Sequence, residues 1–358
     1  MDAVNIRALE ERAEELLEPG VFGYFAGGAG DEWTLNENVA AFRRLQLLPR
    51  VLVDVSEVDT STSLLGVRIA MPVVVAPVAF QRLVSPDGEP GMARAAQTAG
   101  TIFTLSTIAS ARPSDVTAGN RWMQVYVFRD RGITRAIIDE AVQGGFQALL
   151  VTVDAPRAGR RERDLHTGFR LPADLGVPAI GHRSMTVAEV FDLIDRSFSW
   201  ADLAELVSTS PLPVLVKGIH TPEDALLAVE HGAAGVVVSN HGGRQLDSVP
   251  ATIQMLPAIA GALGGRTTVL MDGGIRRGTD VLKALALGAD AVMAGRAMLW
   301  GLACGGQAGA ESALRILHAE VELGMTLLGV TRVADIGPAH IHPPQPARVR
   351  AAVDPLSS

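Results

Sequence analysis

Residues 235–247 have the sequence GVVVSNHGGRQLD. Gly235–Val238 is a short β-branched apolar run, which is typical of a buried strand. A polar, glycine-rich turn follows and holds His241 and Arg244 three residues apart. An imidazole can take up a proton near neutral pH, and a guanidinium can grip an anion with two N–H groups. The stretch therefore predicts a strand that ends at a reactive site, although a plain loop with a solvated arginine fits these residues equally well.

Seven further apolar runs of similar length recur along the chain. They are Val73–Ala76, Ile102–Leu105, Met123–Val127, Leu149–Val153, Val214–Val216, Val269–Met271 and Ala291–Ala294. Helical patterns separate most of these runs, and fully apolar strands that alternate with helices indicate a parallel sheet covered by helices. Eight such units predict an α/β fold, a closed (β/α)8 TIM barrel. A doubly wound open sheet is the alternative, but no glycine fingerprint follows the first strand.

The remaining segments predict one domain, 1–358, in three parts. These are an N-terminal helix and cap segment (1–70), the barrel (71–325) and a C-terminal tail (326–358). Apolar residues at helical spacing predict the first helix over 6–17, and we expect Pro19-Gly20 to end it. The longest gap between strands, 157–214, follows the fourth strand. We expect it to contain a mobile loop and a helix near 200–207.

Composition excludes several classes of function. The net charge is −8 and no basic cluster occurs, so a nucleic-acid partner is not expected. Cys304 is the only cysteine, which excludes an internal disulfide and a cysteine-based metal site. No histidine–carboxylate set has the spacing of a metal site, so we expect no metal. No apolar run approaches the ~20 residues of a membrane helix. We therefore expect a soluble, cytoplasmic protein that does not bind membranes.

In a (β/α)8 barrel, reactive side chains gather where strands end and the following loops begin. The candidate residues at these exits are Pro77, Val78, Ala79, Ser106, Gln124, Tyr126, Thr152, Asp154, Arg161, Lys217, Ser239, His241, Arg244, Asp272, Gly274, Arg276, Gly295 and Arg296. Gly274 and Gly295 follow the last two strands, where barrels commonly bind phosphate through backbone N–H groups and a helix N-terminus. Tight turns with solvated arginines are the alternative for these two exits.

Eight further blocks accompany SNHGGRQLD in the order found in one family. They are YFAGGA (24–29), PVA (77–79), QVY (124–126), TVDAPR (152–157), GRR (159–161), LVKG (215–218), DGGIRRG (272–278) and GR (295–296). With them the chain resembles the FMN-dependent α-hydroxy-acid oxidase and dehydrogenase family, which includes glycolate oxidase, lactate oxidase and mandelate dehydrogenase. The resemblance covers nearly the whole chain. The pattern is nearest to glycolate oxidases and their bacterial hydroxy-acid relatives.

The resemblance implies a role for each substrate-side candidate. His241 would be the base that removes a proton from the substrate, with Asp154 orienting its imidazole. Arg161, Arg244 and Tyr24 would bind the substrate carboxylate. The resemblance thus implies four residues that act in catalysis, which are His241, Asp154, Tyr126 and Arg244. Tyr126 would hydrogen-bond the hydroxyl or carbonyl end of the substrate.

The resemblance also implies an FMN site. Lys217 would lie beside the flavin N1–C2=O edge, where a fixed cation stabilises the reduced cofactor. The residues expected to hold the ring and ribityl chain are Pro77, Val78, Ala79, Ser106, Gln124, Thr152, Ser239 and Asp272. Those expected to hold the phosphate are Gly274, Arg276, Gly295 and Arg296.

The expected reaction is oxidation of an (S)-2-hydroxy acid to the 2-oxo acid, with O2 taking the electrons and giving H2O2. Ile108 stands where glycolate oxidases carry a bulky aromatic residue, so we expect mandelate-type or medium aliphatic substrates to be preferred over glycolate. Phe80 and Met185 are expected to line the same apolar space. Two alternatives remain open, a dehydrogenase that uses a quinone or another acceptor and a non-redox phosphate-binding barrel. By resemblance we expect a homo-oligomer, a tetramer or an octamer.

Overall fold

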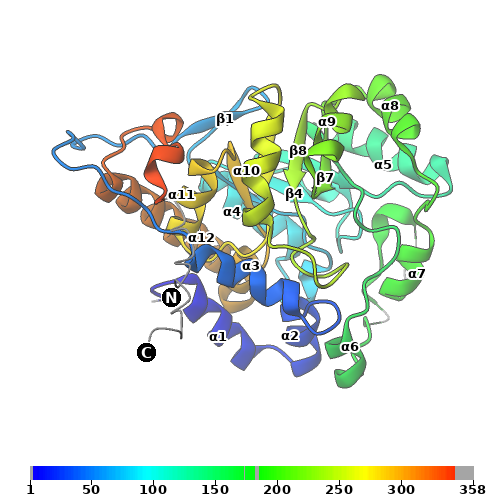
Figure 1. Cartoon of the computed structure of the whole chain (residues 1–358). Coiled ribbons are helices and arrows are strands. Elements are labelled where there is room, and N and C mark those ends of the chain that lie inside the picture. Colours follow the sequence, from blue (N-terminus) through cyan, green and yellow to red (C-terminus); the bar gives the residue numbers. More distant parts are fainter. Residues whose placement is uncertain (1–2, 173, 182–184, 343–358) are drawn as a thin grey trace, which may run out of the picture.

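The computed structural model describes residues 3–172, 174–181 and 185–342. Eight parallel strands close into a barrel in the order β10-β3-β4-β5-β6-β7-β8-β9 (Figure 1). The strands are β3 (Val73–Val75), β4 (Ile102–Leu105), β5 (Asn120–Val125), β6 (Ala148–Thr152), β7 (Val214–Ile219), β8 (Gly235–Val238), β9 (Thr268–Met271) and β10 (Ala291–Ala294). The predicted (β/α)8 barrel is thus confirmed, and the open doubly wound sheet is excluded.

Alternation along each strand explains why these runs contain almost no polar residues. Trp122, Leu150 and Val237 belong to a cluster that fills the interior of the barrel. Their neighbours in sequence, such as Met123 and Val151, belong to the larger cluster that packs against the outer helices. Because both faces of each strand are buried, both are largely apolar, and polar exceptions such as Gln124, Thr152 and Lys217 lie toward the strand exits.

A small hairpin covers one end of the barrel interior. It consists of β1 (Thr62–Leu64) and β2 (Val67–Ile69), which pair antiparallel. Leu64 and Ile69 are each 1% exposed and pack into the interior cluster. The hairpin therefore closes the apolar core at the end opposite the strand exits.

Helices surround the barrel. They are α4 (Gly88–Thr98), α5 (Arg131–Gln143), α8 (Trp200–Thr209), α9 (Pro222–Glu230), α10 (Thr252–Leu263), α11 (Gly278–Ala286) and α12 (Arg296–Leu328). Helix α12 is bent at Gly305 and Gly306, whose backbone angles are not helical. Two short 3-10 turns, η4 (Val333–Asp335) and η5 (Pro338–His340), follow it. The last part of the predicted tail, 343–358, lies outside the described residues.

The N-terminal segment contains more helix than the sequence predicts. Helix α1 (Ile6–Leu16) is present as expected and packs against α12. Pro19-Gly20, however, does not only end α1, because Pro19 is the first residue of α2 (Pro19–Ala26). Proline suits the first position of a helix, because a backbone N–H at that position has no carbonyl partner within the helix. A third helix, α3 (Trp33–Arg43), lies in the cap segment, where the sequence analysis predicts no helix.

The long connection between β6 and β7 also contains unpredicted helices. Helix α8 confirms the one expected near 200–207. Two shorter helices, α6 (Glu162–Thr167) and α7 (Val187–Asp192), precede it, together with the 3-10 turn η3 (Pro178–Ile180). Helix α6 packs against α2, so the connection meets the N-terminal segment (Figure 1). Among the described residues, no helix is both long and apolar enough to cross a bilayer.

Candidate active site

A cavity at the carboxyl ends of the barrel strands brings the candidate residues together. Those that line it are Tyr24, Pro77, Val78, Ala79, Ser106, Ile108, Gln124, Tyr126, Thr152, Arg161, Lys217, His241, Arg244, Asp272, Gly274, Arg276, Gly295 and Arg296. The other two candidates, Asp154 and Ser239, lie directly behind His241 and Lys217 and hydrogen-bond to them. The cavity and its immediate surroundings therefore contain every strand-exit candidate, together with Tyr24 and Ile108.

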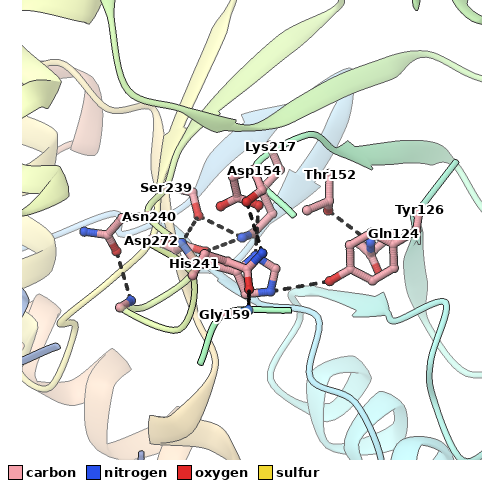
Figure 2. Close-up of polar contacts among 12 residues, drawn as sticks. Gln124, Tyr126, Thr152, Asp154, Gly159, Lys217, Ser239, Asn240, His241 and Asp272 are labelled. Atoms are coloured by element: carbon pink, nitrogen blue, oxygen red, sulfur yellow. Dashed lines mark hydrogen bonds and ion pairs between the residues drawn. The ribbon is translucent and has the colours of Figure 1, made fainter. Parts of the chain in front are cut away.

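His241 lies between a carboxylate and a phenol (Figure 2). Its Nδ1 is 2.9 Å from Oδ1 of Asp154, and its Nε2 is 3.4 Å from the hydroxyl of Tyr126. Burial alone would raise the pKa of Asp154, but His241 and Lys217 together hold it below its ordinary value. An ionised Asp154 accepts the Nδ1–H bond and leaves the Nε2 lone pair directed into the cavity. His241 is thus arranged as a base.

Tyr126 stays a neutral hydrogen-bond donor in this position. Burial raises the pKa of its phenol far above the ordinary value, and the nearby Asp154 raises it further. The hydroxyl can therefore donate to an oxygen of a ligand without becoming a competing base.

The loop after β8 is anchored on two sides. The backbone N–H of His241 donates to Oγ of Ser239 over 3.1 Å. Asn240 and Asn38 on α3 exchange two side-chain hydrogen bonds of 2.8 Å each. The N–H of Ala29 donates to the carbonyl oxygen of Gly243 over 2.8 Å. The N-terminal segment therefore helps to fix the loop that carries the base.

Two guanidinium groups flank the ring of Tyr24. The Cζ atoms of Arg161 and Arg244 lie 5.6 and 5.1 Å from the ring centroid. Nη1 of Arg244 donates to the carbonyl oxygen of Tyr24 over 2.7 Å, and burial lowers the pKa of Arg244 to about 10 with a further contribution from Arg161. The carboxylate of Asp164 lies 4.0 Å from Nη1 of Arg161 and offsets part of this positive charge. Two cations beside one carboxylate leave a net positive charge, so the pair forms an anion site. A planar carboxylate fits this pair.

Lys217 forms a second charged centre in the cavity (Figure 2). Its ammonium group is 2.8 Å from Oγ of Ser239 and 3.0 Å from Oδ2 of Asp272. Burial would lower the pKa of Lys217, but the carboxylates of Asp272 and Asp154 outweigh it and raise the pKa. The lysine therefore remains a fixed cation within the barrel mouth.

Comparison with known proteins identifies the family. Residues 13–343 match the family model described as FMN-dependent dehydrogenase. The chain belongs to this family. Glycolate oxidase 3 of Arabidopsis thaliana is 46% identical over 354 residues, which cover 95% of this chain and 96% of the relative. Glycolate oxidase of Spinacia oleracea is 45% identical over the same shares of the two chains.

Solved structures of mandelate oxidase have the same fold. One, with (S)-4-hydroxymandelic acid, superposes with a TM-score of 0.89 at 40% identity and covers 95% of this chain and 98% of that one. Together these findings confirm the resemblance to the FMN-dependent α-hydroxy-acid oxidase and dehydrogenase family, and FMN is the cofactor.

The residues of the cavity fit FMN. Oδ1 of Asp272 is buried and has no partner among the described residues, as expected of an acceptor reserved for a ribityl hydroxyl. Gly274 has φ +84, and an added Cβ would lie 2.0 Å from the carbonyl oxygen of Asn38. Only glycine permits this close approach of α3 to the loop after β9. The N-cap of α12 is Gly295, which has no capping side chain, so its free N–H groups suit a phosphate.

The two arginines expected at the phosphate differ in their surroundings. Nε of Arg276 lies 3.4 Å from Oε2 of Glu10. Arg296 donates to the carbonyl oxygens of Phe25, Gly27 and Gly242 over 2.8 to 2.9 Å. Both arginines line the cavity, and their contact with phosphate stays a prediction.

Some residues of the site do not follow from the strand-exit pattern. Phe191 on α7 lines the cavity beside Tyr126, whereas Phe80 and Met185, which we expected there, are not among its lining residues. Phe80 is fully buried in the core instead. The sequence analysis also did not identify Asn38, which anchors the loop after β8 through Asn240. Phe191 and Asn38 lie on helices outside the strand pattern, and only tertiary contacts bring them to the site.

Proposed function

We propose that this protein oxidises (S)-2-hydroxy acids to 2-oxo acids with FMN and passes the electrons to O2. One observation carries the proposal. A histidine base backed by a buried carboxylate shares a cavity with a pair of guanidinium groups and a fixed lysine. A 2-hydroxy acid needs all three, because its carboxylate must be held, its proton removed and the negative charge on the cofactor balanced.

The chain's own residues divide these tasks. Arg161 and Arg244 hold the carboxylate, which fixes the neighbouring carbon at the His241–Tyr126 pair. Nε2 of His241 takes the substrate proton, and Asp154 stabilises the imidazolium that results. Tyr126 donates a hydrogen bond to the substrate oxygen as it becomes a carbonyl. The buried walls exclude water from these contacts, which strengthens them.

The electron balance requires an acceptor. Oxidation of R–CHOH–COO⁻ to R–CO–COO⁻ releases two electrons and two protons. FMN, when bound, accepts the electrons from the substrate. Transfer of two electrons and two protons to O2 then gives one H2O2. The names of the relatives, glycolate oxidase and mandelate oxidase, support O2 as the acceptor.

We propose further that mandelate-type or medium aliphatic substrates are preferred over glycolate. Ile108 is buried at the cavity wall and leaves more space than an indole would. Burial of apolar surface there contributes roughly 25 cal/mol per Å². A phenyl or branched alkyl group should therefore bind better than the hydrogen of glycolate.

The test of this proposal is anaerobic bleaching of the bound flavin by glycolate, lactate, 2-hydroxyoctanoate and each enantiomer of mandelate, followed by air. Bleaching by the (S)-acids and recovery with H2O2 release is expected. Recovery only with a quinone indicates the dehydrogenase alternative, and no bleaching by any acid indicates a non-redox barrel. Ile108→Trp should shift the preference toward glycolate, and an unchanged ranking would show that residue 108 does not set the pocket.

A further inference from the structure

The cavity has a second apolar wall besides Ile108, and the sequence analysis did not predict it. Phe191 is 3% exposed and lines the cavity. Its ring centroid lies 5.6 Å from that of Tyr126, at an interplanar angle of 52°. Ile108 follows β4, Tyr126 follows β5, and these strands are neighbours in the barrel. Ile108 and Phe191 therefore belong to the same sector of the barrel mouth as the Tyr126 hydroxyl.

The backbone around Phe191 is fixed, although it belongs to a long connection. Thr186 begins α7 with a capping box, in which its side chain and that of Glu189 bond each other's backbone N–H groups. Just after α7, the carbonyl oxygen of Leu193 accepts from the N–H of Arg129 over 2.9 Å. Ile194 forms an antiparallel bridge with Phe128. These contacts tie the end of α7 to the chain just after Tyr126, so Phe191 and Tyr126 keep one relative position.

The polar contacts of the site determine what faces this wall. A bound hydroxy acid has its carboxylate at Arg161 and Arg244 and its hydroxyl-bearing carbon near Nε2 of His241. The remaining substituent must then point to a part of the cavity without charge. Phe191 and Ile108 supply such a surface, and an aromatic ring there favours offset or edge-to-face contact with another ring.

We propose that Phe191 is a specificity-determining residue that binds the side chain of the substrate and favours aryl groups over small ones. The inference rests on the proposed function, because that function places the carboxylate and the reacting carbon. It adds the residue that selects the side chain. Ile108 leaves the space, and Phe191 provides the contact that makes occupation of this space favourable.

The test separates binding of the side chain from the oxidation. Phenylacetate and acetate carry the carboxylate but have no hydroxyl to oxidise, so their affinities for the FMN-loaded protein can be measured by calorimetry. Wild type should bind phenylacetate more tightly than acetate. Phe191→Ala should lower the affinity for phenylacetate about tenfold, the usual effect of removing an apolar contact from a pocket. The affinity for acetate should change less than twofold. Phe191→Leu should give an intermediate loss.

Phe198→Leu is the matched control. Phe198 belongs to the same connection, packs beneath Arg131 at 5.4 Å, and lines a neighbouring cavity rather than this one. It should leave both affinities unchanged. If Phe191→Ala lowers the affinities for phenylacetate and acetate equally, Phe191 only positions Tyr126. If neither affinity falls, the side chain of the ligand lies elsewhere in the cavity. Either result overturns the inference, and Phe191→Leu decides it if the alanine variant does not fold.

The two proposals fail in different ways. If wild type binds phenylacetate through Phe191 but no 2-hydroxy acid bleaches its flavin, the proposed oxidation is wrong and the aryl subsite stands. If (S)-mandelate bleaches the flavin and Phe191→Ala retains the wild-type ratio of kcat/KM for mandelate and glycolate, the oxidation stands and the subsite is wrong.

Discussion

His241 combines a position between Asp154 and Tyr126 with an unusual backbone. Its φ is +57, a left-handed conformation that residues other than glycine rarely adopt. Such a conformation costs about 1–3 kcal/mol and persists only where the surroundings enforce it. Here the enforcing contacts are the Ser239 side chain and the Asn240–Asn38 pair. The geometry supports a role for His241 that a solvated loop histidine would not need.

Replacing the base tests this role directly. His241→Ala should retain FMN, because the imidazole faces Asp154 and Tyr126 rather than the phosphate side of the cavity. The rate of flavin bleaching by the best substrate should fall by a factor of ~10² or more, the usual contribution of a positioned base. Stopped-flow absorbance under anaerobic conditions measures it. His166→Ala, at an exposed position on α6, is the control, and a near-normal rate in His241→Ala would exclude the assignment.

Replacing either of the paired arginines should weaken the binding of a carboxylate ligand without loss of the cofactor. Arg161→Met and Arg244→Met should each lower the affinity for oxalate by roughly ten- to a hundredfold, because a charge-assisted hydrogen bond contributes ~1.5–3 kcal/mol. Titration of the flavin absorbance measures the affinity. Arg277→Met is a suitable control, because Arg277 is half exposed and pairs with Glu320. Oxalate affinities equal to wild type in both variants would rule out the clamp.

At the scale of elements, one buried carboxylate connects two loops of the site. Glu89 is the second residue of α4 and is fully buried. It accepts hydrogen bonds from the N–H of Gln81 over 3.1 Å, and from the N–H and hydroxyl of Ser110 over 2.8 and 2.6 Å. Gln81 follows the Ala79 loop and Ser110 follows Ile108. Glu89 therefore holds the loops after β3 and β4 together.

This arrangement predicts a pH-dependent stability difference. Burial raises the pKa of Glu89 above its ordinary 4.5, although the three donors oppose the rise. The folded chain then keeps this proton to a higher pH than the unfolded chain. Wild type therefore loses stability as the pH rises from 4.5 through the folded pKa. Glu89→Gln cannot lose a proton and should not show this loss.

Urea unfolding of both proteins between pH 4 and 8 measures the difference. Glu89→Gln should be less stable by about 1–3 kcal/mol at the acid end, because its amide cannot accept from every donor. The deficit should shrink as the pH rises. A deficit that grows with pH would mean that the fold lowers the pKa of Glu89, and the argument from burial would be wrong.

The elements differ in how far the sequence predicts them. The strands could be predicted because burial on both faces forces an unbroken apolar run, and α10 could be predicted because its apolar face repeats. Helices α3, α6 and α7 could not. They are short or weakly patterned, and tertiary contacts stabilise them, as Asn38 shows by its bonds to Asn240. The same reason explains why residues at strand exits were found and Phe191 was not.

The surface of the molecule has an apolar patch that no other part of the described chain covers. It consists of Leu48, Val51, Leu52, Val53, Leu323 and Leu327, all of them more than a third exposed. The N–H of Arg50 donates to the carbonyl oxygen of Leu328 over 2.9 Å, so the loop and the end of α12 lie side by side. Clustered apolar side chains of this size are typical of protein–protein contacts. We propose that this patch is a contact between copies of the chain in the homo-oligomer that the resemblance implies.

Leu52 is the most informative position in this patch. Its side chain is completely exposed and its backbone is left-handed at φ +60, so no contact within the described residues compensates for either feature. Burial of each such leucine against a second copy contributes about 1.5–3 kcal/mol, and a buried glutamate there would cost more than that gain. Leu52→Glu, alone and with Leu327→Glu, should therefore shift the protein to smaller species.

Light scattering after gel filtration measures the mass, and FMN absorbance shows that the barrel is intact. Leu165→Glu, an exposed leucine on α6, should leave the mass unchanged. A wild type that is already monomeric, or a double variant with the wild-type mass, would show that the patch serves no contact between copies.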